Sequence, residues 1–108
     1  MIQPQPFVGC TVTLSATPQS ISSLIKPLYP RSNNQVAAHL VMTADPSNAG
    51  VAVLVGDSTL STSNFGESLD INQQFILGPF NVNSIPLANI FVRGASGTPK
   101  LNVTFVTL

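Results

Sequence analysis

Apolar residues occupy alternate positions in short runs along much of this chain. The run at 101–106 is the clearest, because Leu101, Val103 and Phe105 stand at every second position. Side chains of a strand point alternately to its two faces, so this period predicts strands with one buried face. Residues 51–55 are all apolar, which is typical of a strand covered on both faces. Further strands are expected at 8–15, 36–42, 73–77 and 87–93, with shorter ones at 58–61 and 68–71.

Turn-forming residues separate these runs at close intervals. Examples are Asp45-Pro46-Ser47-Asn48, Gly78-Pro79 and Gly94-Ala95-Ser96-Gly97. We therefore expect an all-β chain, a single antiparallel β-sandwich of jelly-roll-like form with seven or eight short strands. The 108 residues have room for one domain, so we assign 1–108 to it, with an extended N-terminal arm at 1–7.

One segment departs from the strand pattern and predicts a short helix at 18–26. Thr17 has the side chain of an N-cap, and Pro18 suits the first helical position because its missing N–H needs no partner there. Pro27 disfavours helical backbone at the residue before it, which limits the helix to two turns at most. An apolar stripe at helical spacing is formed by Ile21, Leu24 and Ile25. We expect this helix to close one open end of the sandwich.

Charged side chains are scarce, since 8 of the 108 residues are Asp, Glu, Lys or Arg and their net charge is zero. Soluble domains usually carry about 25% charged residues and a net charge away from zero. The neutral balance argues against a basic surface for nucleic acid, and no Lys/Arg cluster is present for anionic lipid. We therefore expect no nucleic-acid partner and no membrane partner. Contact with neighbouring protein subunits is favoured instead.

The residues that usually carry catalysis or bind metals form no recognisable active site. His39 is the single histidine, and its place on the second face of a predicted strand favours a structural role over that of a catalytic base. Cys10 is the single cysteine, which excludes an intrachain disulfide and predicts a buried, inert thiol. A loose calcium site could form from Asp57, Glu67 and Asp70, although their spacing matches no EF-hand. We predict no enzyme activity, no cofactor and no metal.

Ordered blocks in the C-terminal half form a pattern found in a known family. A strand ending in Val55-Gly56-Asp57-Ser58 leads to the turn Ser61-Thr62-Ser63-Asn64, and Gly66-Glu67-Ser68 begins the next strand. Residues 87–94 match that family's Leu-x-x-Ile-Tyr-Val-x-Gly block, with Phe91 in place of the tyrosine, and 100–105 match its last strand. The pattern resembles small structural proteins encoded in tailed-phage genomes. The resemblance implies a β-sandwich on the virion without enzyme activity, as a capsid cement or decoration protein or a fibre or tail module.

Residues suited to contact with other subunits gather in three segments. They are Pro4, Pro6 and Phe7 in the arm, Leu28, Tyr29 and Arg31 in the loop at 27–35, and Phe80 and Pro86 in a loop after Gly78. With the resemblance, they predict a cement protein of the capsid exterior, made in the host cytoplasm, that bridges capsid subunits. The partners that the resemblance implies are the major capsid protein and further copies of this chain in a homotrimer.

Two other functions stay open at this stage. Tyr29, Phe65 and Phe80 lie in loops among amide side chains, which would suit a receptor- or carbohydrate-binding module of a phage tail or fibre. A small hydrolase would depend on His39, and no G-x-S-x-G motif is present to supply its nucleophile.

Overall fold

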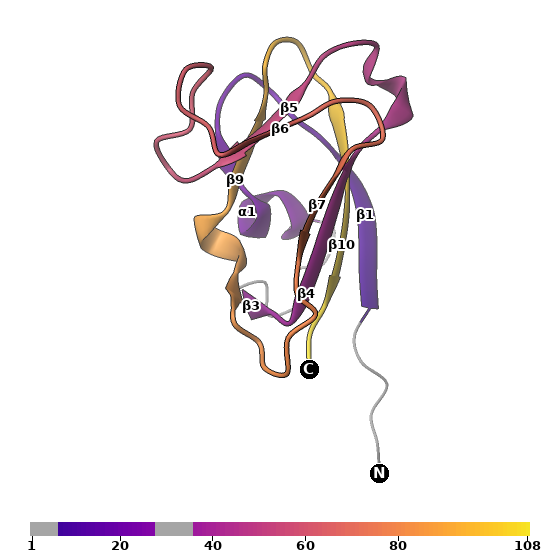
Figure 1. The fold of residues 1–108 in the computed structure, drawn as a ribbon, viewed down its shortest axis with the longest axis vertical. Coiled ribbons are helices and arrows are strands. Elements are labelled where there is room, and N and C mark those ends of the chain that lie inside the picture. The colour runs from indigo at the N-terminus through magenta and orange to yellow at the C-terminus, as the bar shows by residue number, and fades with distance from the viewer. Residues whose placement is uncertain (1–6, 28–35) are drawn as a thin grey trace.

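The computed structural model describes residues 7–27 and 36–108, and two antiparallel four-stranded sheets dominate that part of the chain (Figure 1). The first sheet contains β1 (Phe7–Thr13), β10 (Lys100–Val106), β4 (His39–Ala44) and β7 (Gln74–Leu77), in that order. The second contains β2 (Gln19–Ser20), β9 (Phe91–Gly94), β5 (Val53–Gly56) and β6 (Glu67–Leu69). A two-stranded sheet pairs β3 (Val36–Ala37) with β8 (Ile85–Pro86). Helix α1 (Ile21–Ile25) and the 3-10 turns Pro46–Asn48 and Leu87–Asn89 complete the described elements. The predicted antiparallel, mostly β architecture with one short helix is confirmed.

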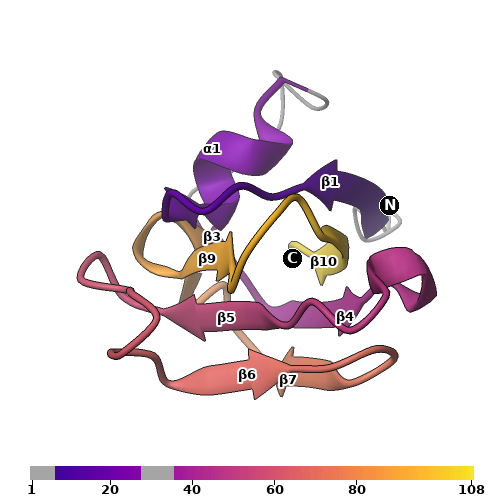
Figure 2. The ribbon, with the colours of Figure 1, turned by 90° about the horizontal axis from the view of Figure 1, so that it is seen from above.

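The strand pairs are nested along the sequence. β1 pairs with β10, β2 with β9, β4 with β7 and β5 with β6, so each pair lies within the one before it. Two further pairings, β10 with β4 and β5 with β9, join the nested pairs into the two sheets. Figure 2 shows β4 leading into β5 alongside β6 leading into β7. The described chain therefore folds as a long double strand that passes from one sheet into the other.

The core follows the alternation that the sequence predicts. In β10, Leu101, Val103 and Phe105 are buried, while the residues between them are more exposed. The second sheet contributes Val53 and Val55 to the same core. Helix α1 adds two fully buried side chains, Ile21 and Ile25. Burying each such side chain stabilises the fold by roughly 1.5–3 kcal/mol, so this core holds the two sheets and the helix together.

The helix begins at Ile21, not at Pro18 as the sequence pattern predicts. The two residues before it instead pair with β9 as strand β2. This pairing keeps the backbone extended through Ser20, whose side chain accepts a hydrogen bond from the Ser23 N–H at 3.1 Å. The Ser23 hydroxyl also donates to Ser20, to its backbone carbonyl, at 2.9 Å. Ser20 is therefore the N-cap, and the expectation for Thr17 is wrong.

Three predicted strands differ from the observed ones. The run at 36–42 is broken at Ala38, because the residues before it pair with β8 and those after it pair with β10. Ala37 and Ala38 are both buried, so the period of two slips at this point. The run at 87–93 begins with a 3-10 turn, and its strand starts only at Phe91. Segment 58–61 contains no named strand and ends in an isolated bridge from Ser61 to Asn64.

Candidate functional site

The predicted contact residues are only partly within the described chain. Phe7, the last residue of the predicted arm, is the first residue of strand β1. Phe80 and Pro86 lie on the segment after β7, and both are exposed. Five of the predicted residues lie outside the described ranges, namely Pro4, Pro6, Leu28, Tyr29 and Arg31.

Phe80 belongs to a surface that we call the apolar end, defined by Phe80, Val82 and Leu108. These side chains are 48%, 63% and 52% exposed, respectively. The Phe80 N–H donates to the Ala38 carbonyl at 2.8 Å. Asn83 donates from Nδ2 to the Leu108 carbonyl at 3.0 Å and accepts from the Leu108 N–H at 2.8 Å. These bonds hold the loop after β7 against the last residues of the chain, at the lower end of the molecule in Figure 1.

Charge is absent from the side chains of the segments that meet there. Residues 36–44, 71–92 and 101–108 contain no Asp, Glu, Lys or Arg. Ile76, on β7 four positions before Phe80, is 52% exposed and adds apolar surface to the same segment. An exposed apolar surface without charges is typical of a region that contacts another protein.

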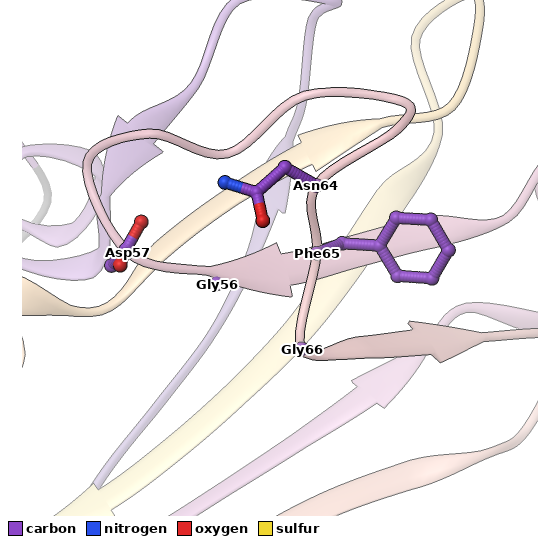
Figure 3. Close-up of a pocket in the computed structure, with 5 residues that line it drawn as sticks. All are labelled: Gly56, Asp57, Asn64, Phe65 and Gly66. Atoms are coloured by element: carbon purple, nitrogen blue, oxygen red, sulfur yellow. The ribbon is translucent and has the colours of Figure 1, made fainter.

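A second surface feature is a shallow pocket of about 240 Å³ at the loop between β5 and β6 (Figure 3). Its lining residues are Gly56, Asp57, Asn64, Phe65 and Gly66. Figure 3 shows the Asn64 side chain between Asp57 on one side and the Phe65 ring on the other. Gly56 and Gly66 have no side chains and the other three lining residues are exposed, so the pocket presents a carboxylate, an amide and an aromatic ring to solvent.

Hydrogen bonds to Thr59 fix the two polar side chains of the pocket. Asp57 Oδ1 accepts from the Thr59 N–H at 2.8 Å and from its hydroxyl at 2.5 Å. Asn64 Nδ2 donates to Thr59 Oγ1 at 2.7 Å and to the Thr59 carbonyl at 3.3 Å. Leu60 is buried next to these residues, and the Gly66 N–H donates back to β5. The loop is therefore tied both within itself and to its sheet.

The electrostatics of the carboxylates follow from these bonds. Hydrogen bonds from Thr59 hold the pKa of Asp57 below its ordinary value, so this carboxylate is ionised at neutral pH. Hydrogen bonds from Ser47, and then from Asn102, lower the pKa of Asp45 in the same way. Burial raises the pKa of the Cys10 thiol, which is half-buried and stays protonated.

The residues considered for metal binding and catalysis are not brought together. Among residues 7–27 and 36–108, no group of three or more His, Cys, Asp and Glu could hold a metal ion, so Asp57, Glu67 and Asp70 do not assemble the calcium site considered above. His39 is half-buried at the start of β4. In the same part of the chain, no helix is long and apolar enough to cross a membrane.

The sequence reasoning did not find the pocket. Asp57 accepts from the N–H two residues further on, at Thr59, which is the usual bond of an aspartate at a turn. The pocket arises because the bridge between Ser61 and Asn64 returns Asn64 to the side of Thr59. The sequence feature that could have indicated this pocket is a pair of turn motifs on either side of an isolated leucine, Leu60.

Comparisons of the chain with protein-family models, with curated proteins and with solved structures find no significant match.

Proposed function

We propose that this chain is a nonenzymatic virion protein, a cement or decoration protein on the capsid exterior that bridges capsid subunits. The observation that carries the proposal is the apolar end, where Phe80, Val82 and Leu108 are about half exposed within segments that have no charged side chain. Water is a poor environment for such a surface, and a protein partner would bury it. The partners of this role are the major capsid protein and two further copies of the chain in a homotrimer.

The strand order supports the finer form of the fold, a jelly roll. The sheet orders β1-β10-β4-β7 and β2-β9-β5-β6 are those of a folded double strand with four nested pairs. Jelly rolls occur in viral capsid proteins and in lectins. A fold alone does not decide a function, so this likeness supports the proposal only together with the apolar end.

The sequence blocks that resemble phage virion proteins coincide with structural units. Val55-Gly56-Asp57-Ser58 spans the end of β5, and Ser61-Thr62-Ser63-Asn64 is the bridged turn. Gly66-Glu67-Ser68 leads into β6, and residues 100–105 lie in β10. These blocks therefore fall in strands, at strand ends and in the connections between them, which agrees with the resemblance.

The proposal is tested by binding the purified protein to phage capsids that lack it. We expect Phe80→Asp to weaken binding at least about tenfold, because an unpaired carboxylate would be buried in the contact. Ile71→Asp is the matched control, since Ile71 is also an exposed apolar residue (39%) but lies in the turn before β7, at the other end of that strand. Equal binding by the wild type and both variants would overturn the role of the apolar end.

Salt provides an independent measurement of the same contact. Because the contact contains no charged side chain, raising NaCl from about 0.05 to about 0.5 M should change the affinity by less than about threefold. A steep loss of affinity with salt would contradict the proposed contact. Sedimentation velocity of the free protein tests the homotrimer.

A second candidate function, a carbohydrate- or receptor-binding module of a tail or fibre, is favoured by the pocket at the β5–β6 loop. Quantitative mass spectrometry of purified particles separates the two locations. Hundreds of copies per particle would support a capsid component, whereas a handful would support a tail or fibre.

A further inference from the structure

We propose that the pocket between β5 and β6 binds a neutral oligosaccharide. The side chains of the site are those of Asp57, Asn64 and Phe65, and its other lining residues are Gly56 and Gly66. This inference rests on the second candidate function above and names its ligand class. It does not depend on the cement role, because the pocket and the apolar end are separate surfaces.

The first argument is that the pocket has hydrogen-bond acceptors to spare. Thr59 donates both of its bonds to Asp57 Oδ1, and the carboxylate also accepts from its own backbone N–H. A carboxylate has about four acceptor positions, so part of its capacity is open to solvent. Asn64 uses its Nδ2 on Thr59, and its Oδ1 has no partner among the described residues. A complementary ligand must therefore donate hydrogen bonds, which hydroxyl groups do. The bonds to Thr59 also hold both side chains in place before any ligand arrives, which lowers the entropic cost of binding.

The second argument is the exposed aromatic ring of Phe65, which lies on the side of Asn64 away from Asp57 (Figure 3). Phe65 is 46% exposed, although Leu60 in the same loop is 4% exposed. Leu60 therefore anchors the loop, and the Phe65 ring is available to a ligand. A pyranose ring has an apolar C–H face as well as hydroxyl groups, so it can cover an aromatic ring and still donate to neighbouring oxygens. Asp57 and Phe65 lie on opposite sides of Asn64 (Figure 3), an arrangement that suits two linked sugar rings better than one.

The charge and size of the pocket narrow the ligand class. The ionised Asp57 repels phosphate, sulfate and acidic sugars, which leaves neutral saccharides. Calcium is disfavoured because it takes roughly six to eight oxygen ligands and the pocket offers one carboxylate and one amide. The volume of about 240 Å³ lies below the usual range for pockets that enclose small molecules. We therefore expect a dissociation constant in the millimolar range, because the pocket is shallow and would contact only part of an oligosaccharide.

Another surface hollow, of about 400 Å³, has a different lining. Its buried amide, Asn48, donates from Nδ2 to the Lys100 carbonyl at 2.9 Å and accepts at Oδ1 from the Lys100 N–H at 2.7 Å. These polar atoms are already used to join two turns. The Asn48 amide therefore has a structural role, whereas Asn64 Oδ1 in the smaller pocket has no partner among the described residues.

The test is an NMR titration of the ¹⁵N-labelled protein with maltose, cellobiose and lactose. At least one of these should shift the amide signals of residues 56–66. For that sugar, Phe65→Ala and Asp57→Asn should each weaken binding by about tenfold, through loss of the ring contact and of the charged acceptor. Asparagine at 57 can still accept the Thr59 N–H, so the loop should keep its form.

The chain offers a matched control for each variant. Phe80→Ala removes a phenylalanine of nearly equal exposure, 48%, that lies outside the pocket. Asp45→Asn changes a carboxylate that also accepts a turn N–H, from Ser47 at 2.9 Å, and lies outside the pocket. Both should leave sugar binding unchanged.

Three results would overturn the proposal: no shift with any of the sugars, equal affinity in the pocket variants and their controls, or shifts produced only by calcium chloride. None of them bears on the capsid-binding test, which depends on Phe80→Asp.

Discussion

At the scale of single residues, polar side chains join distant turns of this protein. Asn48 is 5% exposed and uses both ends of its amide on the backbone of Lys100. A buried amide without partners would cost about 1–3 kcal/mol, so these two bonds fix the turn after β4 against the start of β10. Asp45 accepts at Oδ2 from Asn102 Nδ2 at 3.1 Å and ties the same turn to the middle of β10.

Gly78 is a residue at which even one added methyl group should be poorly tolerated. Its φ is +89°, and a Cβ there would lie 2.5 Å from the Ala38 carbonyl oxygen. We expect Gly78→Ala to lower the free energy of unfolding by about 1–2 kcal/mol for the left-handed backbone and by about 1–3 kcal/mol more for the clash. Urea unfolding measures the total.

Gly50→Ala separates these two contributions. Gly50 has a similar φ of +84°, but a Cβ there would meet nothing within 4 Å. This variant should lose only the backbone part. Equal losses in the Gly78 and Gly50 variants would contradict the close approach to Ala38.

At the scale of elements, the cap of α1 distinguishes the observed helix from the predicted one. Ser20→Ala removes the acceptor of the Ser23 N–H and should lower the free energy of unfolding by about 1 kcal/mol. Thr17→Ala should change it by less than about 0.5 kcal/mol, because Thr17 is exposed and lies outside the helix. Chemical denaturation of both variants measures the difference. A larger loss for Thr17→Ala would instead place the cap where the sequence pattern predicts it.

The elements that the sequence predicted well are those governed by a single sheet. β10 and β7 keep their alternation because one face of β10 is buried and one face of β7 is half-buried along its whole length. Two of the errors, at Ala38 and at Ser20, fall where a short segment pairs with a strand distant in the sequence. The break at Ala38 and the extended Ser20 depend on pairing with strands more than 45 positions away in the sequence, which no local pattern contains.

At the scale of the whole molecule, the two candidate surfaces were predictable to different degrees. Phe80 was expected at a surface because a turn precedes it, whereas Val82 and Leu108 join it only through the bonds between Asn83 and Leu108. The pocket likewise depends on how the β5–β6 loop closes on itself. Composition predicted an uncharged surface, but the positions of its apolar side chains required the tertiary structure.

The stability of the whole molecule should fall in acid. The pKa values of Asp45 and Asp57 are lower in the folded protein than in the unfolded chain, so the folded state binds fewer protons. Their contribution is complete above the ordinary aspartate pKa of about 3.9 and is lost as pH falls through the lower folded values. The midpoint of thermal unfolding, measured from about pH 5 to about pH 2, should therefore decline. A variant with Asp45→Asn and Asp57→Asn should decline less, and an unchanged slope would contradict this assignment.

The nested pairing also determines how the molecule would respond to mechanical load. Phe7 at the beginning of β1 pairs with Val106 at the end of β10. The first and last strands of the described chain therefore have their outer chain ends side by side. Tension applied between those ends would open the β1–β10 ladder one residue pair at a time, as in unzipping, instead of loading all its hydrogen bonds together in shear. The protein should therefore yield at low force when it is pulled by the ends of β1 and β10.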